Sequence, residues 1–272
     1  MAFRIVALDL DGTALDAGSS VRPRTCAAIA AAMERGVEVV LVTGRHHVAV
    51  LPYHAQLGLR TPAICCNGTY VYDFADRRVL SGDPIGKDDA RRMLAVSRRH
   101  AVHAWIYTDA CMTYESANAH VRRLCAWADA LPPAVRPDLR QVDSFERVIE
   151  EAGRVWKFLV SHDDPAVLDA WRSDAADSDA FSIEYSWTRR LDVVRAGNTK
   201  GQRLLEWAAT RGIDPREIIA FGDNHNDITM IRSAGLGVAM GNGEDDVKAV
   251  AARVIGDNSS DAIAETIERF VL

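Results

Sequence analysis

Short apolar segments alternate with alanine-rich segments in the first and last parts of the chain. Residues 4–9 are apolar from Ile5 to Leu8 without alternation, which predicts a strand buried on both faces. Residues 24–35 place apolar side chains at helical spacing, and Gly36 ends this segment. This alternation is typical of a parallel α/β sheet. The same criteria predict further strands at 37–42, 63–66, 191–194, 218–221 and 235–240, and helices at 48–57 and 200–211.

The pattern changes between residues 84 and 190. Strands and helices no longer alternate regularly, and this segment carries five of the six tryptophans. We therefore expect one α/β core, residues 1–83 and 191–272, interrupted by an inserted α+β domain, residues 84–190. Within the insertion, helices are predicted near 87–99 and 118–130, and strands at 102–107, 156–161 and 181–187.

Composition narrows the class of protein. With 272 residues, 48% of them apolar, the chain has ample material for a buried core. Acidic residues outnumber basic ones, 38 to 32, and no basic block occurs, which argues against nucleic acid or an anionic membrane as the main partner. Five cysteines without a CxxC pattern predict neither a disulfide framework nor a zinc site. No signal peptide is predicted, so we expect a cytoplasmic protein without an obligate protein partner.

Asp9 and Asp11 follow the first predicted strand in the pentapeptide 9–13. Ligands of open α/β sheets bind at the carboxyl ends of the strands. Two carboxylates two residues apart, followed by a glycine turn, can direct backbone and side-chain oxygens at one hard cation. A calcium loop of the EF-hand type does not fit, because Ala14 and Ser20 stand where that loop needs glycine and glutamate.

A second acidic cluster, residues 222–227, follows the strand predicted at 218–221. Two acidic clusters at the same edge of a parallel sheet can share a Mg²⁺ ion through oxygen ligands. Asp223 would be a direct ligand, and Asp227 can either orient Asp223 or hold a metal-bound water. The candidate metal ligands are Asp9, Asp11 and Asp223.

Two further positions supply hydrogen-bond donors. Thr43 and Gly44 follow the second predicted strand, so a hydroxyl and backbone N–H groups can hold a phosphoryl oxygen near a helix start. Lys200 opens the helix that follows the strand predicted at 191–194. A threonine at a strand end or an exposed lysine is ordinary by itself. Chance poorly explains an acidic pair, a hydroxyl, a lysine and a second acidic cluster in this order at four strand ends.

These motifs together resemble the haloacid dehalogenase superfamily of phosphatases, over essentially the whole chain. The form of residues 222–227 and the large insertion after Thr43 resemble its Cof-type subfamily, which implies a Rossmann-like, doubly wound parallel sheet with an inserted mobile α+β cap of the C2 type. The segments 43–49, 64–70 and 155–158 resemble bacterial pyridoxal phosphate phosphatases of that subfamily.

The resemblance implies a role for each matched residue. Asp9 is expected to attack phosphorus and form an aspartyl phosphate. Asp11 is expected to protonate the leaving oxygen and then to deprotonate the attacking water. Mg²⁺ and Lys200 are expected to offset the negative charge of nucleophile and phosphoryl group. The phosphoryl oxygens are then bound by Thr43, Gly44, Asn226 and the backbone of Leu10.

The expected substrate is a small phosphorylated metabolite, with pyridoxal 5′-phosphate favoured over a sugar phosphate. A phosphomutase would share the aspartyl phosphate but return the phosphoryl group to a sugar. A phospho-accepting regulatory module also places acidic residues, threonine and lysine at strand ends, but it needs no inserted cover and no second aspartate two residues after the first.

Three residue pairs near these motifs have more than one interpretation. His46 and His47 are either substrate contacts beside the phosphate loop or a surface pair at a helix start. Asn67 and Gly68 form either a simple turn or a hinge or loop on the substrate side. Cys65 and Cys66 are either ligands or small buried side chains; we expect the second, as free thiols, because adjacent cysteines form only a strained disulfide.

Overall fold

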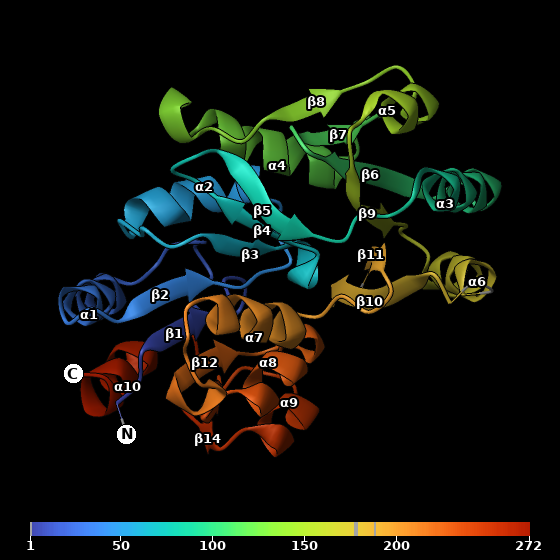
Figure 1. Cartoon of the computed structure of the whole chain (residues 1–272). Coiled ribbons are helices and arrows are strands. Elements are labelled where there is room, and N and C mark those ends of the chain that lie inside the picture. Colours follow the sequence, from blue (N-terminus) through green and yellow to red (C-terminus); the bar gives the residue numbers. More distant parts are fainter. Residues whose placement is uncertain (1, 177–178, 188) are drawn as a thin grey trace. The chain divides into compact units, whose positions relative to one another are not determined.

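The computed structural model of the chain describes residues 2–176, 179–187 and 189–272, and these residues form two compact units (Figure 1). The first unit contains residues 2–45, 53–81 and 199–272. The second unit contains residues 46–52 and 82–198. Each unit has its own sheet and its own buried cluster of apolar side chains.

The first unit is built on a five-stranded parallel sheet. The neighbouring strands are in register, with Leu8 of β1 beside Phe221 of β12 and Leu41 of β2. The carboxyl ends of these three strands therefore lie side by side, as the motifs after them require. The order across the sheet is β14 (Arg253–Val254), β13 (Leu236–Ala239), β12 (Ile218–Gly222), β1 (Ile5–Leu8), β2 (Glu38–Leu41).

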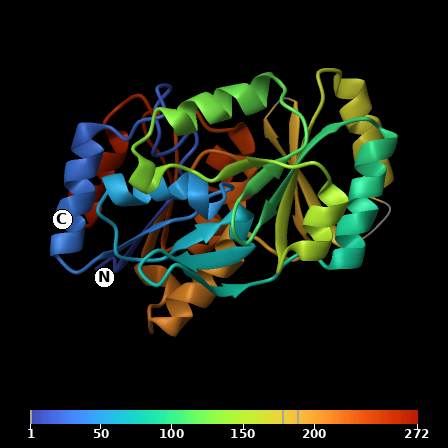
Figure 2. The same cartoon turned by 90° about the horizontal axis from the view of Figure 1, so that it is seen from above.

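Helices pack on both faces of this sheet. Ile5 and Ala7 point to the face that α7 (Lys200–Thr210) covers with Leu204 and Trp207. Alternate strand residues point to the other face, where α1 (Pro23–Glu34) and α10 (Ala262–Phe270) lie side by side (Figures 1 and 2). This is the doubly wound arrangement that the sequence predicted. The shorter helices of the unit are α8 (Ile228–Ser233), α9 (Asp245–Val250) and the 3₁₀ turns Pro215–Glu217 and His225–Asp227.

A small sheet extends the first unit next to β2. Its order is β3 (Ala63–Cys65), β4 (Tyr70–Asp73) and β5 (Arg78–Gly82), and a parallel bridge between Val42 and Ile64 joins β3 to the end of β2. The 3₁₀ turn Cys66–Gly68 connects β3 to β4. The preceding helix α2 (His47–Gln56) is divided between the two units.

The second unit combines a mostly antiparallel sheet with helices on one face. Apolar side chains of α3 (Lys87–Arg99), α5 (Phe145–Glu151) and α6 (Pro165–Ala175) form its core with the sheet. A further helix is α4 (Ala119–Asp129), and a 3₁₀ turn spans Pro133–Val135. The strand order is β10 (Phe181–Trp187), β11 (Arg190–Arg195), β9 (Val155–Ser161), β6 (His103–Thr108), β7 (Met112–Tyr114), β8 (Leu139–Gln141).

The predicted strand at 191–194 does not belong to the parallel core. It is β11, and it pairs antiparallel with β9 and β10 inside the second unit. The second unit accordingly extends to residue 198, whereas the insertion was expected to end at 190. A short segment of mostly apolar residues, here with Asp192 among them, fits either kind of sheet, so the sequence pattern could not distinguish the two. Among the described helices, none combines the length and apolar character needed to span a bilayer.

Candidate active site

The loop after β1 packs directly on the loop after β12. The backbone N–H of Asp9 donates to the carbonyl of Phe221 at 3.1 Å, and the Thr13 hydroxyl donates to Asp223 Oδ1 at 2.7 Å. Gly12 has a φ of +81°, and a Cβ there would lie 2.2 Å from Asp223 Oδ2. Glycine is therefore required for both the turn and the close approach of the Asp223 carboxylate.

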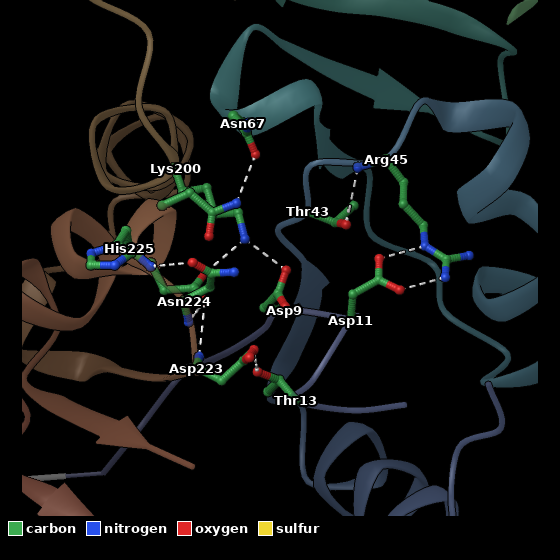
Figure 3. Close-up of polar contacts among 12 residues, drawn as sticks. Asp9, Asp11, Thr13, Thr43, Arg45, Asn67, Lys200, Asp223, Asn224 and His225 are labelled. Atoms are coloured by element: carbon green, nitrogen blue, oxygen red, sulfur yellow. Dashed lines mark hydrogen bonds and ion pairs between the residues drawn. The ribbon is translucent and has the colours of Figure 1, made fainter. Parts of the chain in front are cut away.

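Lys200 connects the two acidic loops (Figure 3). Its Nζ donates to Asp9 Oδ1 at 2.6 Å and to Asp227 Oδ1 at 2.7 Å. All three side chains are buried. Lys200 stands in the first turn of α7, which Thr199 caps by accepting a hydrogen bond from the N–H of Gln202. The lysine thus reaches the site from a helix start, and the strand before it belongs to the second unit.

Asp227 holds the loop that carries Asp223. Its Oδ2 accepts the backbone N–H groups of Asp223 at 2.9 Å and of Asn224 at 3.1 Å, while Oδ1 accepts from Lys200. Both oxygens of this fully buried carboxylate are therefore engaged by donors of the protein.

Buried negative charge dominates the electrostatics of the site. Burial, together with the charges of Asp227, Asp223 and Asp11, raises the pKa of Asp9 well above its ordinary value, although Lys200 acts in the opposite direction. Burial and the charge of Asp227 raise the pKa of Asp223 to about 7. Burial alone lowers the pKa of Lys200, but Asp227 and Asp9 outweigh it and the net pKa is raised.

The carboxylates fit a hard cation. One oxygen from each of Asp9, Asp223 and Asp227 lies within 4.8 Å of the others. Both Asp227 oxygens accept protein donors, whereas Asp9 and Asp223 each accept a side-chain donor at one oxygen only, so Asp9 and Asp223 are the better candidates for holding a metal. Burial and the neighbouring carboxylates raise the pKa of both Asp9 and Asp223, so a cation bound beside them would favour their ionised forms. Carboxylate oxygens are the ligands that Mg²⁺ prefers.

The carboxylate of Asp11 lies outside this cluster. Arg45 donates to it through Nε at 2.7 Å and Nη2 at 2.6 Å, and the Asp11 side chain is 62% exposed (Figure 3). The Arg45 guanidinium also lies 5.0 Å from the centre of the Tyr53 ring. Asp11 was predicted as a metal ligand beside Asp9, through backbone or side-chain oxygens. The structure turns its side chain toward Arg45, and a role for its backbone oxygen stays a prediction. No role was predicted for Arg45, although it directly follows Thr43 and Gly44.

The predicted phosphate-binding residues lie around the same strand ends. Thr43 is fully buried, its N–H donates to the Ile64 carbonyl, and its hydroxyl oxygen accepts from the N–H of Arg45 at 3.2 Å. Gly44 lies between them. The side chain of Leu10 is fully buried, so only its backbone is available for the predicted role. Asn226 Nδ2 donates to Asn67 Oδ1 at 3.0 Å.

The histidines and cysteines of uncertain role are all buried. His46 and His47 belong to the second unit, where His46 Nε2 bonds to the Thr108 carbonyl at 2.7 Å. Burial lowers the pKa of His46 to about 4, so the ring is neutral at pH 7. The alternative of a surface histidine pair is therefore wrong. Cys65 and Cys66 are fully buried free thiols, as predicted.

Comparisons with known proteins cover both units of the chain. A family model described as haloacid dehalogenase-like hydrolase matches residues 6–267. Pyridoxal phosphate phosphatase YbhA of Escherichia coli is 43% identical over 267 residues, which are 98% of each chain. The 5-amino-6-(5-phospho-D-ribitylamino)uracil phosphatase YitU of Bacillus subtilis is 29% identical over 276 residues, 98% of this chain and 97% of the relative. A solved haloacid dehalogenase-like hydrolase from Bacteroides thetaiotaomicron has a TM-score of 0.86 at 24% identity, covering 98% of this chain and 99% of that one.

Proposed function

Because this chain belongs to the haloacid dehalogenase-like hydrolase family, we propose that its candidate site hydrolyses phosphomonoesters through Asp9, with pyridoxal 5′-phosphate as the substrate. The observation that most strongly supports Asp9 as the nucleophile is its contact with Lys200. The lysine holds Oδ1, and the second carboxylate oxygen accepts no hydrogen bond from the described residues. A buried carboxylate held in one orientation, with one oxygen left to react, is suited to nucleophilic attack.

The two chemical steps use the two aspartates of the first loop. Oδ2 of Asp9 bonds to phosphorus as the ester bond breaks, and the leaving oxygen takes a proton from Asp11. Asp11 then accepts a proton from water, whose oxygen bonds to phosphorus as the bond to Asp9 breaks and inorganic phosphate leaves. The first step needs Asp11 protonated and the second needs it ionised, and the contact with Arg45 favours the ionised form.

The remaining residues manage charge and orientation. Lys200, Thr43, Gly44, Asn226 and the backbone of Leu10 bind the phosphoryl oxygens in this proposal. Asp9 and Asp223 would hold Mg²⁺, with Asp227 fixing the Asp223 loop. When bound, Mg²⁺ supplies positive charge that offsets the repulsion between carboxylate and phosphate.

Pyridoxal 5′-phosphate is the preferred substrate because of the similarity to the Escherichia coli enzyme, which extends over both units. The residues named above act on the phosphoryl group, the metal and the leaving oxygen, which all phosphomonoesters share, so they cannot distinguish one phosphomonoester from another. We assign this selection to the second unit. Three of its tryptophans, Trp105, Trp156 and Trp171, are fully buried, so the selection is assigned to other side chains of this unit.

The test is a comparison of phosphate release from pyridoxal 5′-phosphate and from a set of hexose phosphates, with Mg²⁺ present. We expect a higher kcat/KM for pyridoxal 5′-phosphate. Equal efficiency on both classes would contradict the substrate assignment and leave the reaction class intact. Phosphate release without any bisphosphate activator would exclude a phosphomutase.

A further inference from the structure

The turn after β3 contains three consecutive residues in the left-handed backbone region. The φ angles are +50° for Cys66, +59° for Asn67 and +90° for Gly68. Such a conformation costs an L-residue free energy, and asparagine tolerates it better than most. Residues held this way persist only where their surroundings fix them, and they cluster at functional sites. All three residues are buried.

Backbone hydrogen bonds attach this turn to residues 43–45, the segment that contains the predicted phosphate-binding residues Thr43 and Gly44. The N–H of Cys66 donates to the Arg45 carbonyl at 3.0 Å, and the N–H of Asn67 donates to the Thr43 carbonyl at 3.0 Å. Thr69 closes the turn by donating its hydroxyl to the Cys66 carbonyl at 2.6 Å. The turn is thus attached to both ends of the segment Thr43–Arg45.

The same turn also contacts the start of α7. A Cβ on Gly68 would lie 2.2 Å from the Thr199 carbonyl oxygen, so only glycine allows this approach. Arg203 Nε donates to the Gly68 carbonyl at 2.8 Å. Lys200 lies between these two contact points on the helix. The position of the turn is therefore coupled to that of the lysine.

The Asn67 side chain contacts Asn226 in the loop 222–227 that follows β12 (Figure 3). Its Oδ1 accepts from Asn226 Nδ2 at 3.0 Å, and the Asn67 side chain is almost fully buried. Within the described part of the chain, this is the hydrogen bond that the Asn226 side chain makes. An amide nitrogen carries two N–H donors, so the one that Asn67 does not receive remains for an incoming oxygen.

We propose that Asn67 is a positioning residue of the phosphate site, which orients the Asn226 carboxamide so that its second N–H donates to a phosphoryl oxygen. This inference rests on the proposed function, in which Asn226 binds phosphate. Asn67 does not touch the substrate itself. The left-handed turn places the Asn67 side chain beside Asn226. The backbone hydrogen bonds of the turn to residues 43–45 keep this segment and the loop 222–227 in one arrangement.

The competing explanation is that asparagine stands at position 67 only because it tolerates a positive φ. The variant Asn67→Gly separates the two explanations, since glycine adopts this conformation without strain and lacks the carboxamide. A role confined to the backbone predicts no loss in this variant. A positioning role predicts weaker phosphate binding in a protein that is still folded.

The experiment is a calorimetric titration of inorganic phosphate, with Mg²⁺ present, into wild type, Asn67→Gly, Asn226→Ala and the double variant. Asn258→Ala is the matched control, because Asn258 is a half-buried asparagine that joins two loops of the same unit by donating to the Leu15 carbonyl at 2.7 Å. Melting temperatures of all five proteins monitor folding. Turnover of pyridoxal 5′-phosphate and of p-nitrophenyl phosphate by wild type is measured separately.

We expect Asn67→Gly to raise the Kd for phosphate about tenfold. The reason is that the charge-assisted hydrogen bond from Asn226 to phosphate is then no longer aligned. The control Asn258→Ala should leave the Kd unchanged. The double variant should bind phosphate no more weakly than Asn226→Ala, because Asn67 acts through Asn226. Wild-type affinity in Asn67→Gly, or independent additive losses in the double variant, would overturn the inference. An inactive wild type would overturn the proposed function, and the phosphate titration would still report on Asn67.

Discussion

Three acidic residues of the candidate site, Asp9, Asp223 and Asp11, each accept a hydrogen bond from a different kind of side chain. Lys200 holds Asp9, Thr13 holds Asp223, and Arg45 holds Asp11. The Arg45 contact is bidentate, and two parallel N–H···O bonds restrict direction more than one bond does. The Asp11 side chain is largely exposed, and the contact with Arg45 restricts where its carboxylate points.

Loss of the contact between Arg45 and Asp11 should lower the rate of turnover. We predict that Arg45→Ala lowers kcat with pyridoxal 5′-phosphate by about 10- to 100-fold, because an unfixed acid–base group contributes less of its usual effect. Arg45→Lys should keep only part of the wild-type kcat, since lysine cannot form the bidentate contact with Asp11. Arg216→Ala is the control: Arg216 pairs with Asp214 in the same way at the surface of the same unit. Equal kcat for Arg45→Ala and Arg216→Ala would refute the role of Arg45.

Asp223 should matter for the metal more than for the fold. In chelator-treated protein, we predict that added Mg²⁺ raises the melting temperature, because a ligand that binds only the folded state stabilises it. Asp223→Ala should reduce this rise and should require at least about tenfold more Mg²⁺ for half-maximal turnover. A thermal-shift titration with Mg²⁺ measures the first effect without any substrate. Full activity after exhaustive chelation would exclude the metal from the mechanism.

Some of these residue contacts could be predicted from the sequence, and others could not. Asp9 and Asp223 follow strands of one parallel sheet, so their proximity follows from the fold class. Asn67 was left open between a turn and a functional loop, because its reach toward Asn226 depends on three left-handed residues in a row. Pairing between Arg45 and Asp11 likewise depends on side-chain directions that spacing does not reveal.

At the scale of elements, long periodic segments were predicted well and short or polar ones were missed. The expected helix at 87–99 is α3, and the expected strand at 181–187 is β10. The prediction omitted α6, although Asp164 followed by Pro165 is a typical helix start. The assignment of β11 to the core was wrong because its partners β9 and β10 are identified only by long-range pairing.

The pairing of β9 with β11 includes an ion pair that the sequence did not indicate. Lys157 and Asp192 form a salt bridge, and each residue is 3% exposed. The Lys157 Nζ also lies 5.3 Å from the centre of the Tyr107 ring on β6. Two buried charges stabilise a fold poorly as a pair, but removal of one leaves the other without compensation.

We therefore predict that Lys157→Met lowers the free energy of unfolding of the second unit by about 3–5 kcal/mol. Chemical denaturation followed by circular dichroism measures this value. Arg140→Ala is the control, since Arg140 pairs with Asp138 in the same unit but both side chains are largely exposed, and its loss should cost about 1 kcal/mol or less. A loss in Lys157→Met no larger than in this control would show that the buried pair has no special weight.

At the scale of the whole molecule, the candidate site collects segments far apart in the chain. Five segments meet within the first unit: residues 9–13, 43–45, 66–68, 199–203 and 222–227. The chain between the third and the fourth of these segments folds largely as the second unit, residues 82–198. Family membership, supported by the match over residues 6–267, applies to both units. The chemistry is thus proposed for one unit and the choice of ester for the other.

The central claim is that Asp9 is the nucleophile of a phosphatase, and the most direct measurement compares phosphate release by wild type and by Asp9→Asn. Both purified proteins would be assayed with pyridoxal 5′-phosphate and Mg²⁺, with melting curves to confirm folding. An amide cannot form the aspartyl phosphate, so we predict that Asp9→Asn lowers kcat by at least ~10³-fold, or about 4 kcal/mol of barrier. Near-wild-type turnover by folded Asp9→Asn would contradict the covalent mechanism.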